Sequence, residues 1–139
     1  MSKRLRAFVE ARAQDRCEYC RRYMEVIGDI FFEIEHIMPS SRGGSTVADN
    51  LALSCRRCNS LKGAATEAVD PETGQRVRLF HPRLDQWSEH FQRSDDLLQI
   101  LGISSIGRAT VARLQFNHER EQRVREVQRD YLSEVYPLD

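Results

Sequence analysis

Short apolar runs separated by turn residues set the pattern of the first half of this chain. Residues 3–15 predict a helix, because apolar side chains recur there at helical spacing, at Leu5, Phe8, Val9 and Ala13. Residues 30–36 are rich in β-branched and aromatic side chains and predict a strand, which a turn at 28–29 joins to a shorter strand over 23–27. A short helix is expected from Asn59 to a stop at Gly63.

The second half predicts a smaller set of mixed elements. We expect a turn over 70–74, a strand over 77–80, a hairpin of residues 87–93 and 97–103, and a helix from Ser104 or Ser105 through Leu114. Asn117 is expected to cap a last helix. The packing face of that helix is predicted at Val124, Val127, Tyr131 and Val135, and its solvated face at Arg120, Arg123, Arg125 and Arg129.

These elements predict an α+β protein with a knuckle, a strand hairpin, a loop, a second knuckle and a helix in that order. We expect residues 1–66 to form one core, and residues 67–139 to form a small mixed C-terminal extension packed on it. The length of 139 residues and the hydrophobic content of 40% suit a small domain with an appended lobe.

Four cysteines in two Cys-x-x-Cys pairs add a candidate metal site. Cys17 and Cys20 form the first pair, and Cys55 and Cys58 form the second. Matching pairs of this kind are typical of a tetrahedral structural zinc site. Residues 21–54 separate the pairs, which exceeds the ~15–20 residues of a simple two-knuckle module and leaves room for the hairpin. Disulfides within each pair are the alternative.

Composition limits the setting in which the chain works. No apolar run approaches the ~20 residues that span a bilayer, and the start of the chain shows no secretory signal, so we expect an intracellular, cytoplasmic protein without a membrane partner. The 21 basic residues balance 21 acidic ones, with a small basic excess in residues 1–65. Charge therefore gives only weak support for nucleic-acid binding, and the oligomeric state stays open.

The segment between the cysteine pairs carries residue types that suit phosphodiester hydrolysis. The imidazole of His36 is a natural general base near neutral pH. Glu35 and Asn59 offer side-chain oxygens to a hard divalent cation such as Mg²⁺ or Mn²⁺. Adjacent strand residues point to opposite faces, so Glu35 and His36 converge only if the strand ends or bends there, which Pro39 and the glycine-rich loop favour.

The order and spacing of these residues resemble the sequence motif of a known family. Its motif is matched by Glu35-His36, Pro39, Gly43-Gly44, Asn50-Leu51 and Cys55-Arg-Arg-Cys58-Asn59-Ser-Leu-Lys62. The run resembles HNH endonucleases of the ββα-metal (His-Me finger) fold. The resemblance implies that His36 is the general base, that Glu35 and Asn59 bind the catalytic cation, and that Asn50 braces the loop and orients the histidine. It also implies structural zinc on the four cysteines and a DNA substrate in preference to RNA.

Two departures and one alternative accompany the resemblance. Asparagine replaces the frequent histidine at position 59, which favours Mg²⁺ or Mn²⁺, and Glu35 stands where aspartate is common. Arg42 and Lys62 are candidate phosphate contacts. The main alternative is a non-catalytic zinc module that binds nucleic acid or protein, since such a module needs the cysteines but not Glu35, His36 and Asn59.

Overall fold

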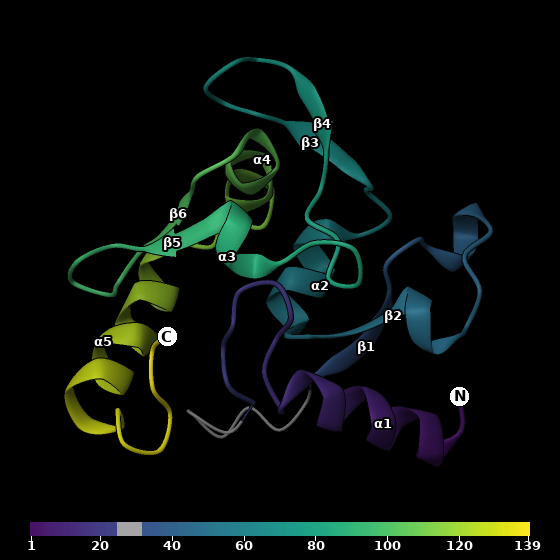
Figure 1. Cartoon of the computed structure of the whole chain (residues 1–139), viewed down its shortest axis with the longest axis horizontal. Helices are drawn as coiled ribbons and strands as arrows, with labels where there is room; N and C mark the ends of the chain where they lie inside the picture. The colour runs from purple at the N-terminus through teal and green to yellow at the C-terminus, as the bar shows by residue number, and fades with distance from the viewer. Residues whose placement is uncertain (25–31) are drawn as a thin grey trace. The chain divides into compact units, whose positions relative to one another are not determined.

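The computed structural model describes residues 1–24 and 32–139 and divides the chain into two compact units (Figure 1). The first unit comprises Met1–Thr66 with His81–Asp85, and the second comprises Glu67–Phe80 with Gln86–Asp139. This division differs from the predicted one in residues 81–85, which belong to the first unit. The strand predicted at 23–27, the turn at 28–29 and the start of the strand at 30–36 lie wholly or partly outside the described residues.

Both units mix helices with short strands, which confirms the α+β class. In the first unit the elements are α1 (Lys3–Ala13), β1 (Glu33–His36), 3-10 turns at Ser40–Arg42 and Ala48–Asn50, β2 (Leu51–Ser54) and α2 (Arg56–Lys62). In the second unit they are β3 (Glu67–Val69), β4 (Arg76–Arg78), α3 (Trp87–His90), β5 (Phe91–Arg93), β6 (Ile100–Gly102), α4 (Ser105–Arg113) and α5 (Glu119–Tyr131).

The predicted site lies in a β1–β2–α2 element of the first unit. β1 pairs antiparallel with β2, with Glu33 opposite Ser54 and His36 opposite Leu51. β2 is buried along its whole length, as its apolar sequence requires, and α2 begins one residue after Cys55. This is the order of elements that the ββα prediction requires.

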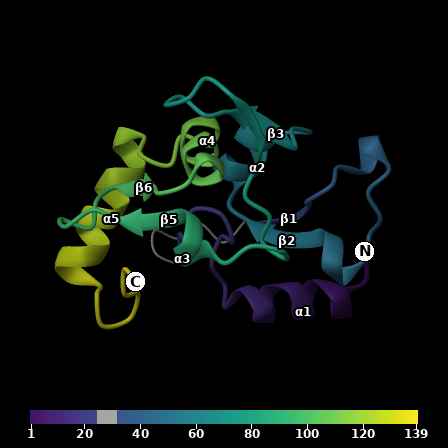
Figure 2. The same cartoon turned by 45° about the horizontal axis from the view of Figure 1, so that its top comes forward.

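Helix α1 lies alongside this hairpin in both views (Figures 1 and 2). The Ser2 side chain caps its start by accepting from the backbone N–H of Leu5. Val9 is fully buried, whereas Phe8 of the predicted apolar face is 52% exposed. The guanidinium of Arg12 donates to the carbonyls of Ala48 and Leu51, at 3.0 and 2.7 Å, and so ties the helix to the start of β2.

The second unit is built around an aromatic cluster. The rings of Phe80 and Phe116 both lie against Phe91, with centroids 5.2 and 5.5 Å away. The predicted hairpin forms from β5 and β6, but Trp87–His90 is a helical turn and not part of its first strand. α4 begins after Ser104, whose side chain caps it as predicted.

A buried ion pair fixes the turn between β3 and β4. The Asp70 carboxylate accepts from the guanidinium of Arg108 at 3.0 and 2.8 Å and also from the backbone N–H of Glu72. The hydrogen bonds from Arg108 hold the pKa of Asp70 below its usual range. Asp70 therefore stays ionised and holds α4 against this turn.

The prediction for the last helix is wrong in part. Of the expected apolar face, Val124 is buried, but Val127, Tyr131 and Val135 are exposed. Arg125, expected in solvent, is buried and donates to the carbonyls of Leu98 and Phe116. α5 therefore packs through a guanidinium that satisfies loop carbonyls, a contact that hydrophobic periodicity cannot detect. The helix is capped by His118 and not by Asn117.

Candidate metal centre and active site

Backbone pairing with β2 brings the two cysteine pairs together. The backbone N–H of Glu18 donates to the Leu53 carbonyl at 2.9 Å, and the Glu18 carboxylate accepts from the Leu53 N–H at 2.9 Å. The first knuckle is thus held beside the end of β2, just before Cys55. The guanidinium of Arg83 pairs with the same Glu18 carboxylate. Arg83 lies in the His81–Asp85 segment, which also belongs to the first unit.

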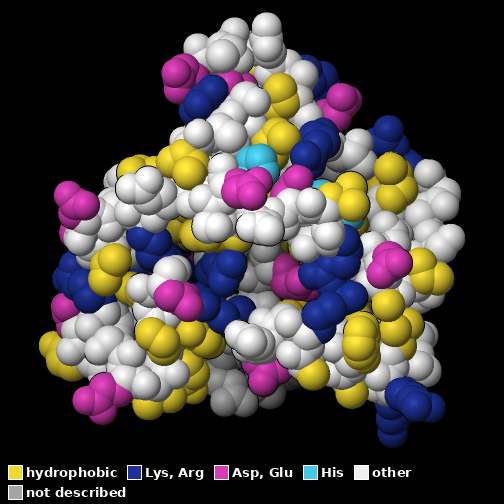
Figure 3. Space-filling model, viewed as in Figure 1, with side chains coloured by type: hydrophobic (Ala, Val, Ile, Leu, Met, Phe, Trp, Pro, Cys, Tyr) yellow, Lys and Arg dark blue, Asp and Glu magenta, His cyan; other side chains and the backbone are white. Residues whose placement is uncertain are grey.

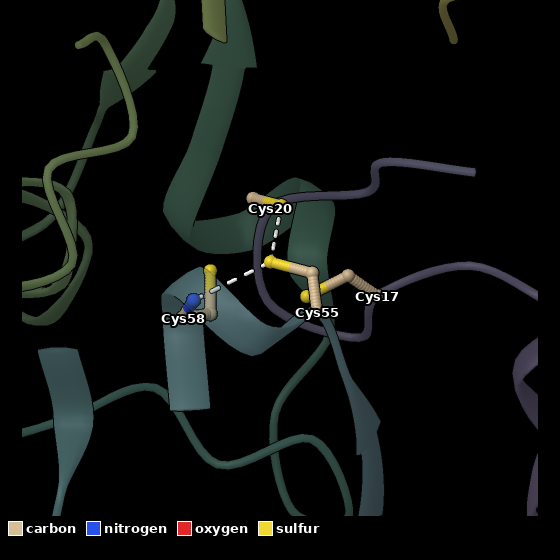
Figure 4. A group of neighbouring side chains, drawn as sticks. All are labelled: Cys17, Cys20, Cys55 and Cys58. Atoms are coloured by element: carbon tan, nitrogen blue, oxygen red, sulfur yellow. Dashed lines mark hydrogen bonds between the residues drawn. The ribbon is translucent and has the colours of Figure 1, made fainter. Parts of the chain in front are cut away.

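The four cysteines form a buried cluster at this junction (Figure 4). Cys17 and Cys20 come from the first knuckle, Cys55 from the residue after β2, and Cys58 from α2. All four Sγ atoms lie within 4.8 Å of one another, and those of Cys20 and Cys55 are 3.8 Å apart. Tetrahedral zinc with Zn–S bonds of about 2.3 Å places its sulfur atoms ~3.8 Å apart. The cluster therefore fits a structural zinc ion.

None of the four cysteines is in a disulfide bond, so each sulfur can serve as a metal ligand. The disulfide alternative is therefore not the arrangement that the structure has. Hydrogen bonds from Cys17 and its neighbours lower the pKa of Cys20, and contacts within the same cluster raise the pKa of Cys58. A divalent cation in the cluster would stabilise all four side chains as thiolates.

His36 stands at the end of β1 and points to the following loop. Its Nε2 atom lies 2.8 Å from the Thr46 hydroxyl oxygen, and the side chain is partly exposed. The chain bends directly after it, at Ile37 and Met38, which is the strand end that convergence on a site requires. One ring nitrogen is therefore held by a hydroxyl, and the imidazole keeps access to solvent.

Asn50 braces the loop that follows β1. Its Oδ1 accepts from the Met38 N–H at 2.9 Å, and its Nδ2 donates to the carbonyls of Met38 and Ser45 at 3.0 and 2.9 Å. The backbone carbonyl of Asn50 also accepts from the Ile37 N–H. These contacts fix the chain immediately after His36, which is the position that a loop-bracing role demands.

Gly44 lets the loop close on these contacts. A Cβ atom at position 44 would lie 1.7 Å from the Met38 carbonyl oxygen and 2.9 Å from Asn50 Nδ2. No real Cβ tolerates such a distance, so the loop needs a residue without a side chain at this point.

We expect Gly44→Ala to separate Asn50 from Met38 and to displace His36. The expected loss of unfolding free energy is about 1–3 kcal/mol, measured by denaturant unfolding. Gly43→Ala is the matched control, because a Cβ there meets nothing and only the left-handed φ of 89° is strained, at a cost of about 1 kcal/mol. Equal stability of the two variants would contradict the role of Gly44.

Glu35 lies in a buried polar cluster between β1 and α2. Only 4% of the residue is exposed; one carboxylate oxygen accepts from the Tyr19 hydroxyl, and the other lies 3.2 Å from Lys62 Nζ. Burial raises the pKa of Glu35, and the Lys62 ammonium and the Tyr19 hydroxyl oppose that rise. Burial also raises the pKa of Tyr19, so this residue acts as a neutral donor.

Lys62, a predicted phosphate contact, is buried in the first unit. Its residue exposure is 2%, and besides facing Glu35 its ammonium donates to the Ile37 carbonyl at 3.1 Å. The charge is thus committed to the interior of the first unit. Arg42, by contrast, lies exposed on the loop and donates to the Thr66 hydroxyl at 3.0 Å.

Asn59 and Glu35 are not joined by a contact among the described residues; Asn59 instead contacts Glu33. The Asn59 amide nitrogen donates to the Glu33 carboxylate, which also lies 3.5 Å from the guanidinium of Arg56. Neither Glu33 nor Tyr19 was among the predicted site residues. The period-2 pattern of a strand would have placed Glu33 on the same face as Glu35, and Tyr19 lies inside the first cysteine pair.

The remaining histidines have local roles, as expected of lone histidines. His81 Nδ1 accepts from the backbone N–H groups of Arg83 and Leu84, and His118 caps α5. His90 lies 2.6 Å from the Ser104 hydroxyl. On the face of the molecule drawn in Figure 3, acidic and basic side chains are interspersed, in keeping with the zero net charge.

Comparison with known proteins matches the segment that carries this site to one protein family. Residues 17–65 match the family model for HNH endonuclease, which confirms the resemblance for the segment from the first cysteine pair to the end of α2. This segment, about a third of the chain, is similar to HNH endonuclease domains. Searches of curated proteins and of solved structures found no match. No helix within residues 1–24 and 32–139 is long and apolar enough to cross a membrane.

Proposed function

We propose that the chain is a metal-dependent HNH endonuclease that hydrolyses phosphodiester bonds in DNA, with His36 as the general base. The observation that carries this proposal is the position of His36: it ends β1 of a ββα element that carries the four-cysteine cluster, inside the segment that matches the HNH model. DNA as the substrate, and 5′-phosphate and 3′-hydroxyl products, come from the family resemblance.

In the proposed reaction His36 takes a proton from a water molecule. The water oxygen forms a bond to phosphorus, and the bond from phosphorus to the 3′ oxygen breaks. That oxygen takes a proton from solvent water and leaves as an alcohol, and the protonated His36 then returns its proton to solvent. The ring nitrogen beside Thr46 is held by the hydroxyl, which orients the imidazole, and the other nitrogen can accept the proton. Asn50 keeps the backbone after His36 in place.

Mg²⁺ or Mn²⁺ is the proposed cofactor, since a hard divalent cation neutralises the charge on the phosphoryl oxygens. The resemblance assigns it to Glu35 and Asn59. That pair does not fit the observed geometry, because both carboxylate oxygens of Glu35 already have buried partners. Arg42, exposed on the loop after β1, is the proposed phosphate contact.

We expect His36→Ala to lose plasmid nicking by about 10²–10⁴-fold, because the general base is removed. The assay compares wild type and variant on supercoiled DNA with Mg²⁺ or Mn²⁺. The variant should melt almost like wild type, since His36 is partly exposed. Equal nicking by both proteins, or nicking by neither under any metal tried, would instead favour the non-catalytic zinc module.

A further inference from the structure

Glu33 and Asn59 are the oxygen-bearing side chains that the fold brings together beside the zinc site. Glu33 lies on β1 opposite Ser54, the residue before Cys55, and Asn59 directly follows Cys58 on α2. Both therefore lie next to the second cysteine pair, Glu33 across the β1–β2 pairing and Asn59 along the chain. Their side chains touch, and 42% of the Glu33 side chain is exposed, so solvent and ions reach its carboxylate.

Glu35 is unsuited to hold a cation in this structure. A cation at its carboxylate would have to displace either the Tyr19 hydroxyl or the Lys62 ammonium. The Lys62 side chain is 2% exposed and also bonded to the Ile37 carbonyl, so its positive charge would stay close to the ion. Like charges at short range in a buried setting repel strongly, which opposes cation binding at this carboxylate.

We propose that Glu33 and Asn59 are the side-chain ligands of the divalent cation and that Glu35 is a positioning residue. A half-turn of the Asn59 amide exchanges its nitrogen for its oxygen and presents that oxygen next to the Glu33 carboxylate. One carboxylate and one amide oxygen, with water completing the shell, suit Mg²⁺ or Mn²⁺. The inference deepens the proposed nuclease function and rests on it for the role of the cation.

Glu35 then has a separate task. Its contacts with Tyr19 of the first knuckle and Lys62 of α2 tie the end of β1, next to His36, to both cysteine-bearing segments. The exposed guanidinium of Arg56 near Glu33 is the competitor that a cation must displace. Because it is solvated, its hold on Glu33 is weak.

The test is Mn²⁺ titration of the zinc-loaded full chain, followed by electron paramagnetic resonance of the free ion. Wild type should bind Mn²⁺ at one site, and Glu33→Gln should weaken that binding about tenfold or more. Asn59→Asp should tighten it, because it adds a second carboxylate. Glu119→Gln, at an exposed carboxylate of α5, should leave it unchanged.

A double variant, Glu35→Gln with Lys62→Met, tests the other half of the proposal. It removes the buried pair without leaving a lone charge, and it should bind Mn²⁺ like wild type. Loss of binding in this variant, with wild-type binding in Glu33→Gln, would overturn the inference. So would a wild-type chain that binds no Mn²⁺. Nicking by wild type in the same buffer is scored separately, so the nuclease proposal can stand when this inference fails.

Discussion

Cys58→Ser is expected to release zinc and to unfold the first unit. Cys58 is buried in the four-sulfur cluster, and the cluster joins the first knuckle to β2 and α2. Structural zinc supplies ~10 kcal/mol or more of apparent folding free energy in small zinc domains, which exceeds what a hairpin and two short helices can supply alone. Zinc content by elemental analysis and thermal unfolding by circular dichroism measure the effect.

Ser60→Ala is the matched control, since Ser60 lies exposed on the same helix two residues away. It should keep zinc and melt like wild type. Addition of a chelator to wild type should reproduce the melting behaviour of Cys58→Ser. A Cys58→Ser protein that melts like wild type, or that retains its full zinc content, would show that the metal does not hold this unit together.

The parts of the fold predicted best are those governed by short-range chemistry. Two Cys-x-x-Cys pairs need a common metal, so their meeting in space followed from the sequence although residues 21–54 separate them. Ser104 capped its helix as expected because a cap needs only a hydroxyl and the next N–H groups. The strand at His36 and the end of α2 before Gly63 were predicted, but α2 begins at Arg56, earlier than the predicted start at Asn59.

Long side chains account for most of what the sequence did not predict. Lys62 and Arg125 bear full charges, and a periodicity argument places such residues in solvent. The structure buries both, because each satisfies carbonyl oxygens, and Lys62 also faces a carboxylate. The partners of Lys62 lie 25 or more residues away, and the Phe116 carbonyl that accepts from Arg125 lies 9 residues away, so no local pattern reports them.

Burial of charged side chains, which the sequence does not report, also affects which residues can bind the cation. Residue chemistry and the family resemblance pair Glu35 with Asn59, but neither describes which carboxylate remains accessible in the folded chain. Accessibility depends on Tyr19 and Lys62, two residues that the motif does not link to Glu35.

Lys62→Met is expected to destabilise the first unit by about 3–5 kcal/mol, because it leaves the Glu35 carboxylate buried without the Lys62 ammonium that pairs with it. Only 2% of the Lys62 side chain and 3% of the Glu35 side chain are exposed, so water cannot replace the lost charge. Denaturant unfolding at neutral pH measures the loss, with zinc kept saturating so that the metal site does not contribute.

The double variant Glu35→Gln with Lys62→Met should recover most of that stability. The neutral amide at position 35 can still accept from the Tyr19 hydroxyl, and no buried charge is left uncompensated. Recovery in the double variant isolates the pair, since loss of packing by Lys62 alone would persist in it. Wild-type stability in Lys62→Met, or an equal loss in the single and double variants, would show that the buried ion pair does not hold β1 to α2.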